Sequence, residues 1–584
     1  MSIESMQKLS PRRNSTQATT VDGLVDEQLE HFAIDPASDF GKTLISIAKR
    51  LYETQSDLNA LWELTLREIN GLEHSDRIAR FNAKKFLSFQ LAKLLDTLQH
   101  SFRKSYQSLG YTDETQLSKG PYPVFDNITA IFSATPVIAR TATYIYACAE
   151  WIEEAFRGRE LMLEIYSRLL NPTSISLANY IVDLEAGPYV GDYMAWNFNS
   201  GMAAIDSTLS HLLGRDDILI RNRNVYGGAW QLIHDWYAKH GNLEIAVEVF
   251  DGYSIDEFAK TLAATQEKYA DRLAEGRRIY VYLESPCNPH GYVLDVPAIC
   301  KLAHEHGLDV MLDATVGTPF LHQPLQREDV AERPDYVIHS YTKDLSGMGS
   351  VIAGCVIGRN ENMFKPKGME GWEQTMFWNV YYIKGAFLNA DAAFEVLQGM
   401  RTLADRMLKK CFNTHVLSEF MNRHSGLTVH CNALADDANR ELCEAQAFLS
   451  LPSPLFTVDF GSIPRDVFLR FFDSLSPTFG HMISLGQSNT IISCPALTTH
   501  SELDEVALAK GGLTPTTIRF AIGDENPIDL LRHLVETARA TIDLEMPGFS
   551  DGFPKPDTFV DVIRDTYVDI HTRYINSRLA KARP

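Results

Sequence analysis

A lysine and an aspartate each follow a short apolar stretch of this chain, thirty residues apart. Asp313 comes directly after residues 310–312, and Lys343 comes shortly after residues 336–338. A primary amine can bond to an aldehyde carbon, and a buried carboxylate can stabilise a cationic ring nitrogen. Since both stretches have the composition of strands, the two groups are expected at the ends of neighbouring buried strands.

Pyridoxal phosphate is a cofactor that uses both groups, the lysine as Schiff base and the aspartate as partner of the pyridinium nitrogen. Each residue alone also has a simpler interpretation. A lysine after a strand is usually a solvated loop residue, and an aspartate there usually forms a turn or caps a helix. The cofactor hypothesis therefore depends on the other motifs of the chain.

The composition excludes some classes of function. The chain has 584 residues, of which 45% are hydrophobic and 22% charged, as in ordinary globular proteins. Its formal net charge is -21, with 75 acidic and 54 basic residues, so a nucleic-acid backbone is not expected as a partner. A single small phosphate needs only local donors and stays compatible with this charge.

Targeting and metal signals are also missing from the sequence. We find no run of eighteen apolar residues, and residues 1–20 have no apolar core, so neither a membrane span nor a secretory signal is expected. The eight cysteines are scattered without a C-x-x-C pair, which predicts neither a disulfide framework nor a metal site. These features favour a cytoplasmic protein.

The first part of the chain, residues 1–120, is interpreted as a flexible start followed by a helical extension. The pattern is helical over residues 40–109, and Gly110 is a plausible stop. One apolar face has three-and-four spacing; it consists of Leu87, Leu91, Leu94, Leu95, Leu98 and Phe102. This segment carries no evident catalytic group, so we expect it to dock on another surface.

The main body alternates strands and helices. Residues 279–283 form an expected strand, Asp295 can cap a helix that stops at Gly307, and residues 310–312 form the next strand. Such a βαβ unit implies a parallel sheet, whose functional groups gather at the carboxyl ends of the strands.

The body is expected to divide into a large domain, a smaller α+β domain and a tail. The large domain covers residues 121–378 and the small domain residues 379–546. Expected strands at residues 455–460 and 517–522 belong to the small domain. The tail, residues 547–584, is expected to be loop plus helix.

A series of short motifs occurs in order along this body. They are Tyr166-Ser167-Arg168, Asn171-Pro172-Thr173, Ser200-Gly201-Met202, Tyr226-Gly227-Gly228, Glu284-Ser285-Pro286-Cys287-Asn288-Pro289, Asp313-Ala314-Thr315, Ser340-Tyr341-Thr342-Lys343, Ser484-Leu485-Gly486, Thr499-His500-Ser501 and Arg519 before Phe520. Together they resemble the Cys/Met-metabolism (trans-sulfuration) family of pyridoxal-phosphate enzymes, over about residues 121–545. That family includes cystathionine γ-synthase, cystathionine γ-lyase, methionine γ-lyase and the O-acylhomoserine sulfhydrylases.

The resemblance implies an α/β fold of the aspartate-aminotransferase type, with a mostly parallel central sheet, a smaller C-terminal α+β domain and, here, an extra N-terminal helical segment. It implies pyridoxal phosphate as cofactor. Ser200, Gly201 and Met202 precede an apolar helix, where free backbone N–H groups and the helix dipole favour a phosphate. Ser340 and Thr342 can add hydroxyl hydrogen bonds.

Further roles are carried over from the family residue by residue. Lys343, Tyr226 and Asp313 are the expected catalytic residues, and Thr315 and Asn288 are expected beside the cofactor. Substrate binding is expected from Arg519, Ser484 and Asn288, with Ile483 near the distal end of the substrate. Tyr166 and Arg168 are expected to reach the cofactor of a neighbouring subunit, so the resemblance implies a homo-oligomer, a dimer or tetramer.

The sequence also departs from the family pattern. Gly347-Met348-Gly349-Ser350 stands where many members have Gly-His-Ser-Asp. Ile483 stands where cystathionine γ-lyases typically have a glutamate, and Gly228 where methionine γ-lyases have a cysteine. An apolar residue at position 483 suits a short, uncharged substituent, whereas the specificity markers as a whole conflict.

The expected reaction is γ-elimination on a homoserine-type or sulfur-containing amino acid through a vinylglycine-type intermediate. Attack by a thiol instead of water would give γ-replacement on an O-acylhomoserine, which is the principal alternative. Aminotransfer and an inactive scaffold are further alternatives. Lys343, Asp313, Tyr226 and Arg519 together argue against the scaffold, and the leaving group is left open.

Overall fold

The computed structural model describes residues 18, 20–31, 33–68, 70–71, 73–108, 112, 114, 133–144, 149–157, 165–498, 508–509 and 511–581. The chain forms two compact units. The N-terminal unit comprises Met1–Ala139, Ile145–Phe156 and Glu160–Met162, and the main unit comprises Arg140–Tyr144, Arg157–Arg159 and Leu163–Pro584. No helix in the described ranges is both long and apolar enough to cross a membrane.

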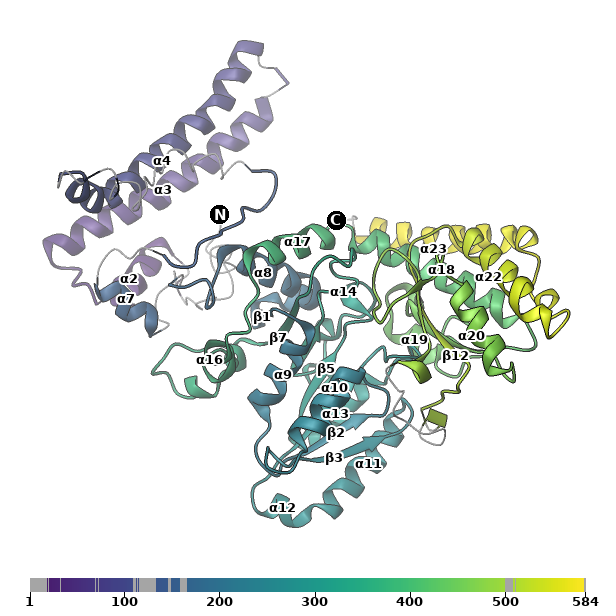
Figure 1. Cartoon of the computed structure of the whole chain (residues 1–584). Coiled ribbons are helices and arrows are strands. Elements are labelled where there is room, and N and C mark those ends of the chain that lie inside the picture. Colours follow the sequence, from purple (N-terminus) through teal and green to yellow (C-terminus); the bar gives the residue numbers. More distant parts are fainter. Residues whose placement is uncertain are drawn as a thin grey trace. The chain divides into compact units, whose positions relative to one another are not determined.

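The N-terminal unit is mainly helical within its described residues, as its sequence predicts. Its helices are α2 (Val21–His31), α3 (Asp39–Glu68), α4 (His74–Ser108) and α7 (Ala149–Phe156). The expected segment 40–109 is therefore two long helices, α3 and α4 (Figure 1). On the predicted apolar face, Leu91 is 49% and Leu94 54% exposed. The side chains of Leu95, Leu98 and Phe102 lie outside the described part, as does Gly110.

The main unit contains a seven-stranded sheet of order β1-β7-β6-β5-β4-β2-β3. Its strands are β1 (Tyr193–Phe198), β2 (Ile218–Asn222), β3 (Ala246–Phe250), β4 (Ile279–Glu284), β5 (Asp309–Asp313), β6 (Tyr336–His339) and β7 (Gly354–Arg359). Neighbouring strands are parallel except where β7 pairs with β1 and β6. This arrangement confirms the mostly parallel central sheet.

This part of the chain also contains helices, several of which pack against the sheet. They are α8 (Pro172–Ala186), α9 (Gly201–Leu212), α10 (Gly227–Gln231), α11 (Ile255–Lys268), α12 (Ala270–Ala274), α13 (Val296–Glu305), α14 (Thr318–Leu321), α15 (Asn360–Met363) and α16 (Tyr382–Lys384). Every residue of β1, β2, β4 and β6 is buried, as expected for a mostly parallel sheet covered on both faces.

The predicted βαβ unit is present as β4, α13 and β5. The side chain of Asp295 caps α13 by accepting a hydrogen bond from the N–H of Ala298. Gly307 follows the helix with φ +70°, a conformation that favours glycine. Asn288, Asp313 and Ser340 consequently lie just after or at the carboxyl ends of β4, β5 and β6, at one edge of the sheet.

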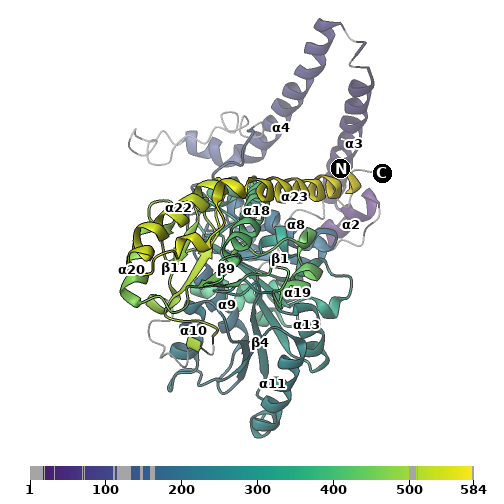
Figure 2. The ribbon, with the colours of Figure 1, turned by 90° about the vertical axis from the view of Figure 1, so that its right-hand side faces the viewer.

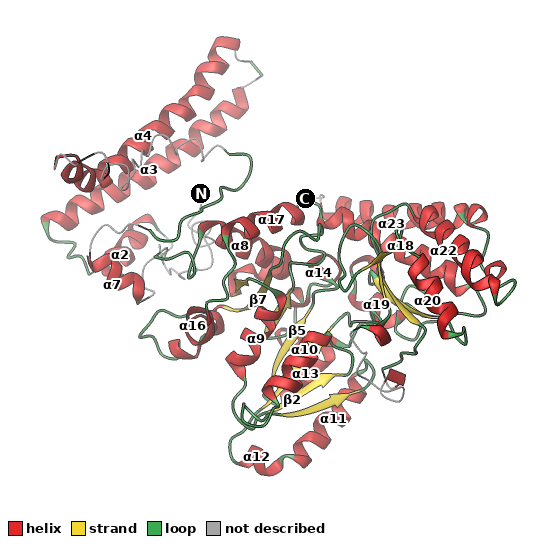
Figure 3. Ribbon diagram, in the orientation of Figure 1, coloured by secondary structure: helices red, strands yellow, loops and turns green. Residues whose placement is uncertain are grey.

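A second, five-stranded sheet has the order β10-β11-β12-β9-β8 and is mainly antiparallel. Its strands are β8 (Thr428–His430), β9 (Leu455–Asp459), β10 (Gly480–His481), β11 (Ile491–Ser493) and β12 (Thr517–Ala521). Figure 3 distinguishes these strands from the helices around them. The two strands predicted in this region are β9 and β12.

The helices of this C-terminal part are α17 (Ala390–Met400), α18 (Leu403–Asn422), α19 (Arg440–Gln446), α20 (Arg465–Ser474), α22 (Pro527–Thr541) and α23 (Val560–Lys581). Helices α18, α22 and α23 lie side by side (Figures 1 and 2). Both sheets belong to one compact unit. The expected domain boundaries at residues 120, 378 and 546 therefore stay predictions.

Candidate functional site

Lys343 lies in the loop after β6, next to a loop of the C-terminal part. Its Nζ donates a hydrogen bond to Ser484 Oγ at 3.0 Å. Burial and the nearby Arg519 lower the pKa of the Lys343 amine, whereas Asp344 and Asp313 act in the opposite direction. The amine is therefore easier to deprotonate than an exposed lysine, which is the property required of a nucleophile or base.

Asp313 ends β5 and is held by the motif that follows it. Its Oδ1 accepts a hydrogen bond from the N–H of Thr315 at 3.0 Å, and Thr315 Oγ1 accepts one from the N–H of Ser340 at 2.8 Å. Thr315 thereby joins the ends of β5 and β6. Burial raises the pKa of Asp313, although the hydrogen bonds from Thr315 oppose that effect. A cation beside this carboxyl group would favour its ionised form.

Glu284, at the end of β4, is a site residue to which the sequence motifs assigned no role. It is the register partner of Asp313, and its carboxyl group accepts hydrogen bonds from the N–H groups of Tyr226 and Asn288, the latter at 3.0 Å. Burial and the proximity of Asp313 raise its pKa well above the ordinary range. Glu284 thus holds the backbone of two expected site residues, Tyr226 and Asn288. It also places a second carboxyl group on the strand next to Asp313.

The expected phosphate cradle is formed where β1 leads into α9. Ser200 caps α9, accepting a hydrogen bond from the N–H of Ala203 at 3.0 Å. A Cβ on Gly201 would lie 2.8 Å from the Cβ of Ser340, so only glycine permits this approach. The first N–H groups of α9, including that of Met202, have no acceptor within the helix and are available to an anion.

Thr342 has a different environment from that expected. Its hydroxyl donates to the carbonyl of Ala353 at 3.2 Å and accepts from the N–H of Ala353 at 3.0 Å. A phosphate contact from Thr342 would require this hydroxyl to exchange its acceptor. In this structure the side chain fastens the Lys343 loop to the segment before β7.

Arg519, on β12, is a buried cation without a carboxylate partner among the described residues. Its guanidinium donates to Asn288 Oδ1 at 3.0 Å and to the carbonyl of Ser484 at 2.6 Å, and its Nε has no partner. Burial lowers the pKa of Arg519 to about 10. A buried guanidinium that binds only neutral oxygens is suited to an incoming carboxylate.

Tyr226 precedes α10, and its side chain is 40% exposed. A Cβ on Gly228 would lie 2.6 Å from Tyr226 Cε1 and 3.0 Å from Met202 Sδ. The absence of a side chain at position 228 therefore lets the Tyr226 ring lie close to the start of α9. The ring is available for stacking on a planar ligand.

Tyr166 and Arg168 do not contact the Lys343 site of their own chain within the described structure. The Arg168 guanidinium donates to the carbonyl of Tyr382 at 2.8 Å and lies 5.6 Å from the centre of the Tyr166 ring. Ile483 is 75% exposed. The motif Thr499-His500-Ser501 lies outside the described residues.

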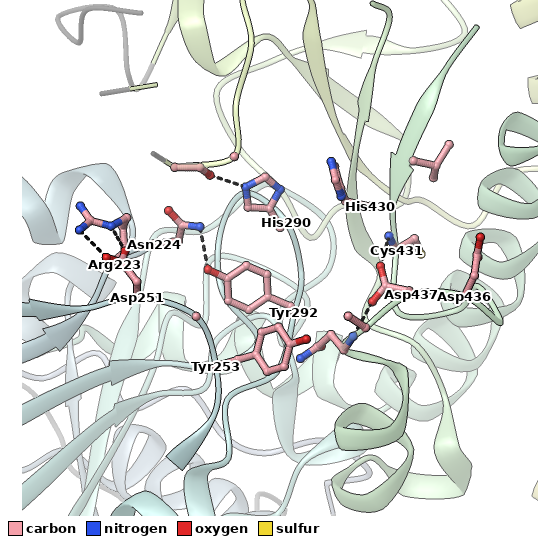
Figure 4. A pocket seen from close by; sticks show the side chains of 16 residues that line it. Arg223, Asn224, Asp251, Tyr253, His290, Tyr292, His430, Cys431, Asp436 and Asp437 are labelled. Carbon is pink, nitrogen blue, oxygen red and sulfur yellow. Dashed lines mark hydrogen bonds and ion pairs between the residues drawn. The ribbon is translucent and has the colours of Figure 1, made fainter. Parts of the chain in front are cut away.

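A cavity of about 660 Å³ lies beside these elements but is a separate feature (Figure 4). Its lining includes Asn224, Tyr292 and His290, and none of the predicted site residues. Asn224 Nδ2 donates to Tyr292 Oη at 2.7 Å, and the ring of His290 bonds the carbonyl of Gly511 at 2.7 Å. These polar groups already have partners, so the cavity carries no evident chemistry.

The residues of the main site fit pyridoxal phosphate. Lys343 offers an amine of lowered pKa, Gly201 leaves space where a Cβ would collide, and the Asp313 carboxyl group at the end of β5 can pair with a cationic ring nitrogen. The unpaired Nε of Arg519 marks a position for a substrate anion on the same site.

Known proteins resemble about two thirds of the chain. The L-methionine gamma-lyase of Fusobacterium nucleatum subsp. nucleatum is 30% identical over 409 residues, 68% of this chain and 91% of that protein. The O-succinylhomoserine sulfhydrylase of Mycobacterium tuberculosis is 28% identical over 397 residues, 67% of this chain and 88% of its own length.

A solved structure of similar fold also resembles the chain. The putative O-acetylhomoserine (thiol)-lyase of Campylobacter jejuni, solved with a pyridoxyl-lysine monophosphate, has a TM-score of 0.59 and 27% identity, covering 70% of this chain and 96% of its own. The family model for Cys/Met metabolism PLP-dependent enzymes matches residues 126–538. The expected family, fold and cofactor are thereby confirmed, and the chain belongs to the Cys/Met metabolism family of PLP-dependent enzymes.

Proposed function

We propose that this enzyme catalyses γ-elimination on a homoserine-type or sulfur-containing amino acid, releasing the γ-substituent, ammonia and a 2-oxo acid. The observation that carries the proposal is that Ser484 accepts hydrogen bonds from two site residues, Lys343 and Arg519. Its hydroxyl accepts from Lys343 and its carbonyl from Arg519, so one residue joins the candidate base to the candidate carboxylate clamp.

The chain's own groups have distinct tasks in this reaction. Bound pyridoxal phosphate supplies an electron sink for the bonds that break at the substrate. Arg519 and Asn288 hold the α-carboxylate, which fixes the orientation of the α-carbon. The Lys343 amine, whose pKa is lowered, takes the α-proton and later the β-proton. The Asp313 carboxyl group would hold the ring nitrogen of that cofactor and favour its protonated form.

Elimination and replacement differ in what attacks after the γ-substituent leaves. The similarity to methionine gamma-lyases supports elimination, and the similarity to a sulfhydrylase supports replacement as the alternative. The test is product analysis of the purified protein with a set of homoserine-type amino acids, with and without an added thiol. Elimination predicts 2-oxo acid without thiol. A thioether formed only with thiol, and no 2-oxo acid, would establish replacement instead.

The oligomeric part of the proposal concerns Tyr166 and Arg168. We propose a homo-oligomer, a dimer or tetramer, in which these residues reach the phosphate of a neighbouring subunit. Their support is that Arg168 packs on the rings of Tyr166 and Tyr382, and that neither Tyr166 nor Arg168 contacts Lys343 of its own chain within the described residues. Mixing inactive Arg168→Ala and Lys343→Ala chains should restore part of the activity through hybrid dimers. An active monomer in sedimentation would contradict this.

The cytoplasmic location is likewise a proposal. Its support is that the seven cysteines within the described residues are all free and buried, which is typical of a reducing compartment. Fractionation of cells that express the protein tests it.

A further inference from the structure

A buried ion pair lies directly beside Lys343 and has no part in the proposed chemistry. Lys410 Nζ is 2.6 Å from Asp344 Oδ1, and the side chains of Lys410 and Asp344 are 0% and 3% exposed. Removing two charges from water is costly, so a buried pair is weak evidence for stability and requires another explanation. Asp344 is the residue after the cofactor lysine.

Lys410 has a second acceptor, in a different loop. Its Nζ also donates to the carbonyl of Gln487 at 2.5 Å. This loop, between β10 and β11, also contains Ser484, which bonds both Lys343 and Arg519. One ammonium group therefore binds the loop of the cofactor lysine and the loop that contacts the carboxylate clamp, Arg519.

The two loops also touch backbone to backbone. Gly486 has φ +75°, and a Cβ there would lie 2.5 Å from the N of Asp344 and 2.9 Å from the Cα of Lys343. Such close packing leaves no space to absorb a shift of one loop, so their relative position depends on what holds them together.

Helix α18 supplies a useful contrast one turn before Lys410. Arg406 donates to the carbonyl of Asp344 at 2.8 Å and to that of Gly399 at 2.9 Å. Arg406 holds only the loop of the cofactor lysine, whereas Lys410 binds both loops. Among the described residues of α18, Lys410 is thus the one that links the Lys343 loop to the Ser484 loop.

We propose that Lys410 is a positioning residue that, through Asp344 and Gln487, keeps the Lys343 amine in register with the carboxylate clamp at Arg519. The inference rests on the proposed roles of Lys343 and Arg519. Loss of the Lys410 ammonium would let the Ser484 loop move relative to Lys343, and a small displacement of a clamp is costly for binding and turnover.

The test uses the cofactor-bound full chain and three variants. Lys410→Met removes the ammonium group but keeps a long side chain. Asp344→Asn with Lys410→Met also removes the unpaired buried carboxylate. Arg423→Met, at the C-terminal end of the same helix, is the matched control because its pair with Glu419 is partly exposed. Melting temperature and the affinity for glycine, read from the visible absorbance of the bound cofactor, are measured for each.

The expected results separate positioning from stability. Lys410→Met should lower the melting temperature and weaken glycine binding about tenfold. The double variant should recover most of the melting temperature while its glycine affinity stays at least about fivefold weaker, because Gln487 still lacks its donor. Arg423→Met should change neither quantity.

Recovery of glycine affinity together with stability in the double variant would overturn the proposal, since the pair would then only stabilise the fold. Normal glycine binding by Lys410→Met would overturn it as well. If the wild type binds glycine but releases no 2-oxo acid from any homoserine-type amino acid, the proposed function fails. The ratio of glycine affinities still decides the role of Lys410.

Discussion

Two helices with apolar residues at helical spacing have opposite environments in this molecule. In α4 of the N-terminal unit, Leu91 and Leu94 are 49% and 54% exposed within the structure. In α18 of the main unit, Phe412 and Phe420 are 1% and 0% exposed. An apolar stripe therefore indicates a face that favours burial, but it does not identify the partner that covers the face.

The two units also differ in where the candidate catalytic and binding residues lie. The main unit buries the Arg519 guanidinium with its Nε unpaired, and Ser484 bonds both this guanidinium and Lys343. Every residue of the described site belongs to the main unit. The unpaired Nε of Arg519, because it lies on the residue that shares Ser484 with Lys343, therefore says more about function than an apolar stripe does.

The largest effect is expected from Lys343→Ala, which tests whether the chemistry of the main unit depends on this amine. Without the amine there is no covalent bond to the cofactor and no proton carrier, so turnover should fall by roughly a thousandfold or more. Cofactor should still bind through its phosphate. Turnover is measured by 2-oxo acid release, and retained cofactor by its release on denaturation. Near-normal turnover would remove Lys343 from the mechanism.

A smaller effect is expected for Arg519→Met, which should raise the KM for the amino acid about a hundredfold by deleting the carboxylate clamp. The same variant should also change how the reactivity of Lys343 depends on pH. The positive charge of Arg519 lowers the pKa of Lys343, so its removal should raise that pKa. The rate at which cofactor-free protein incorporates pyridoxal phosphate needs the neutral amine. Its rise with pH should therefore move to higher pH, and a shift to lower pH would contradict the assignment.

Gly228→Ala should have a moderate effect. The added Cβ would lie 2.6 Å from Tyr226 Cε1, so the ring must move. We expect a loss of about three- to tenfold in kcat/KM with little change in melting temperature, because the ring is partly exposed. Gly241→Ala is the control for stability alone, since nothing lies within 4 Å of its added Cβ although its φ is +91°. Unchanged kinetics in Gly228→Ala would argue against a role for Tyr226.

The smallest effect on catalysis is expected from deletion of residues 1–115. We expect this segment to dock on the main unit or on a neighbouring subunit and to supply no catalytic group. The truncated protein should melt at a lower temperature or change its oligomer size, while Lys343 still binds the cofactor. Identical assembly, melting temperature and kinetics would make the segment an independent module.

Much of the architecture was predictable because local patterns determine it. The strands ending at Asp313 and the helix capped by Asp295 follow from apolar spacing and capping chemistry. The ordered motifs likewise identified Lys343, Asp313 and Arg519, whose proposed roles the structure leaves to experiment. Glu284 was within a quoted motif and at a strand end, so the rule that functional groups gather there could have identified it.

Other features had no signal in the sequence. Lys410 is one lysine in a helix, and its contacts with Asp344 and Gln487 depend on how three distant segments pack. The use of the Thr342 hydroxyl by Ala353 is similarly a tertiary contact. Long-range packing of this kind cannot be read from spacing along the chain.

The most direct test of the central claim is chemical trapping of the bond between the cofactor and the chain. The purified protein, loaded with pyridoxal phosphate, is reduced with borohydride, digested and examined by mass spectrometry. We predict one stable pyridoxyl adduct, on the peptide that contains Lys343. An adduct on a different lysine, or none in a protein that is fully active, would contradict the assignment of Lys343 as the residue that holds the cofactor.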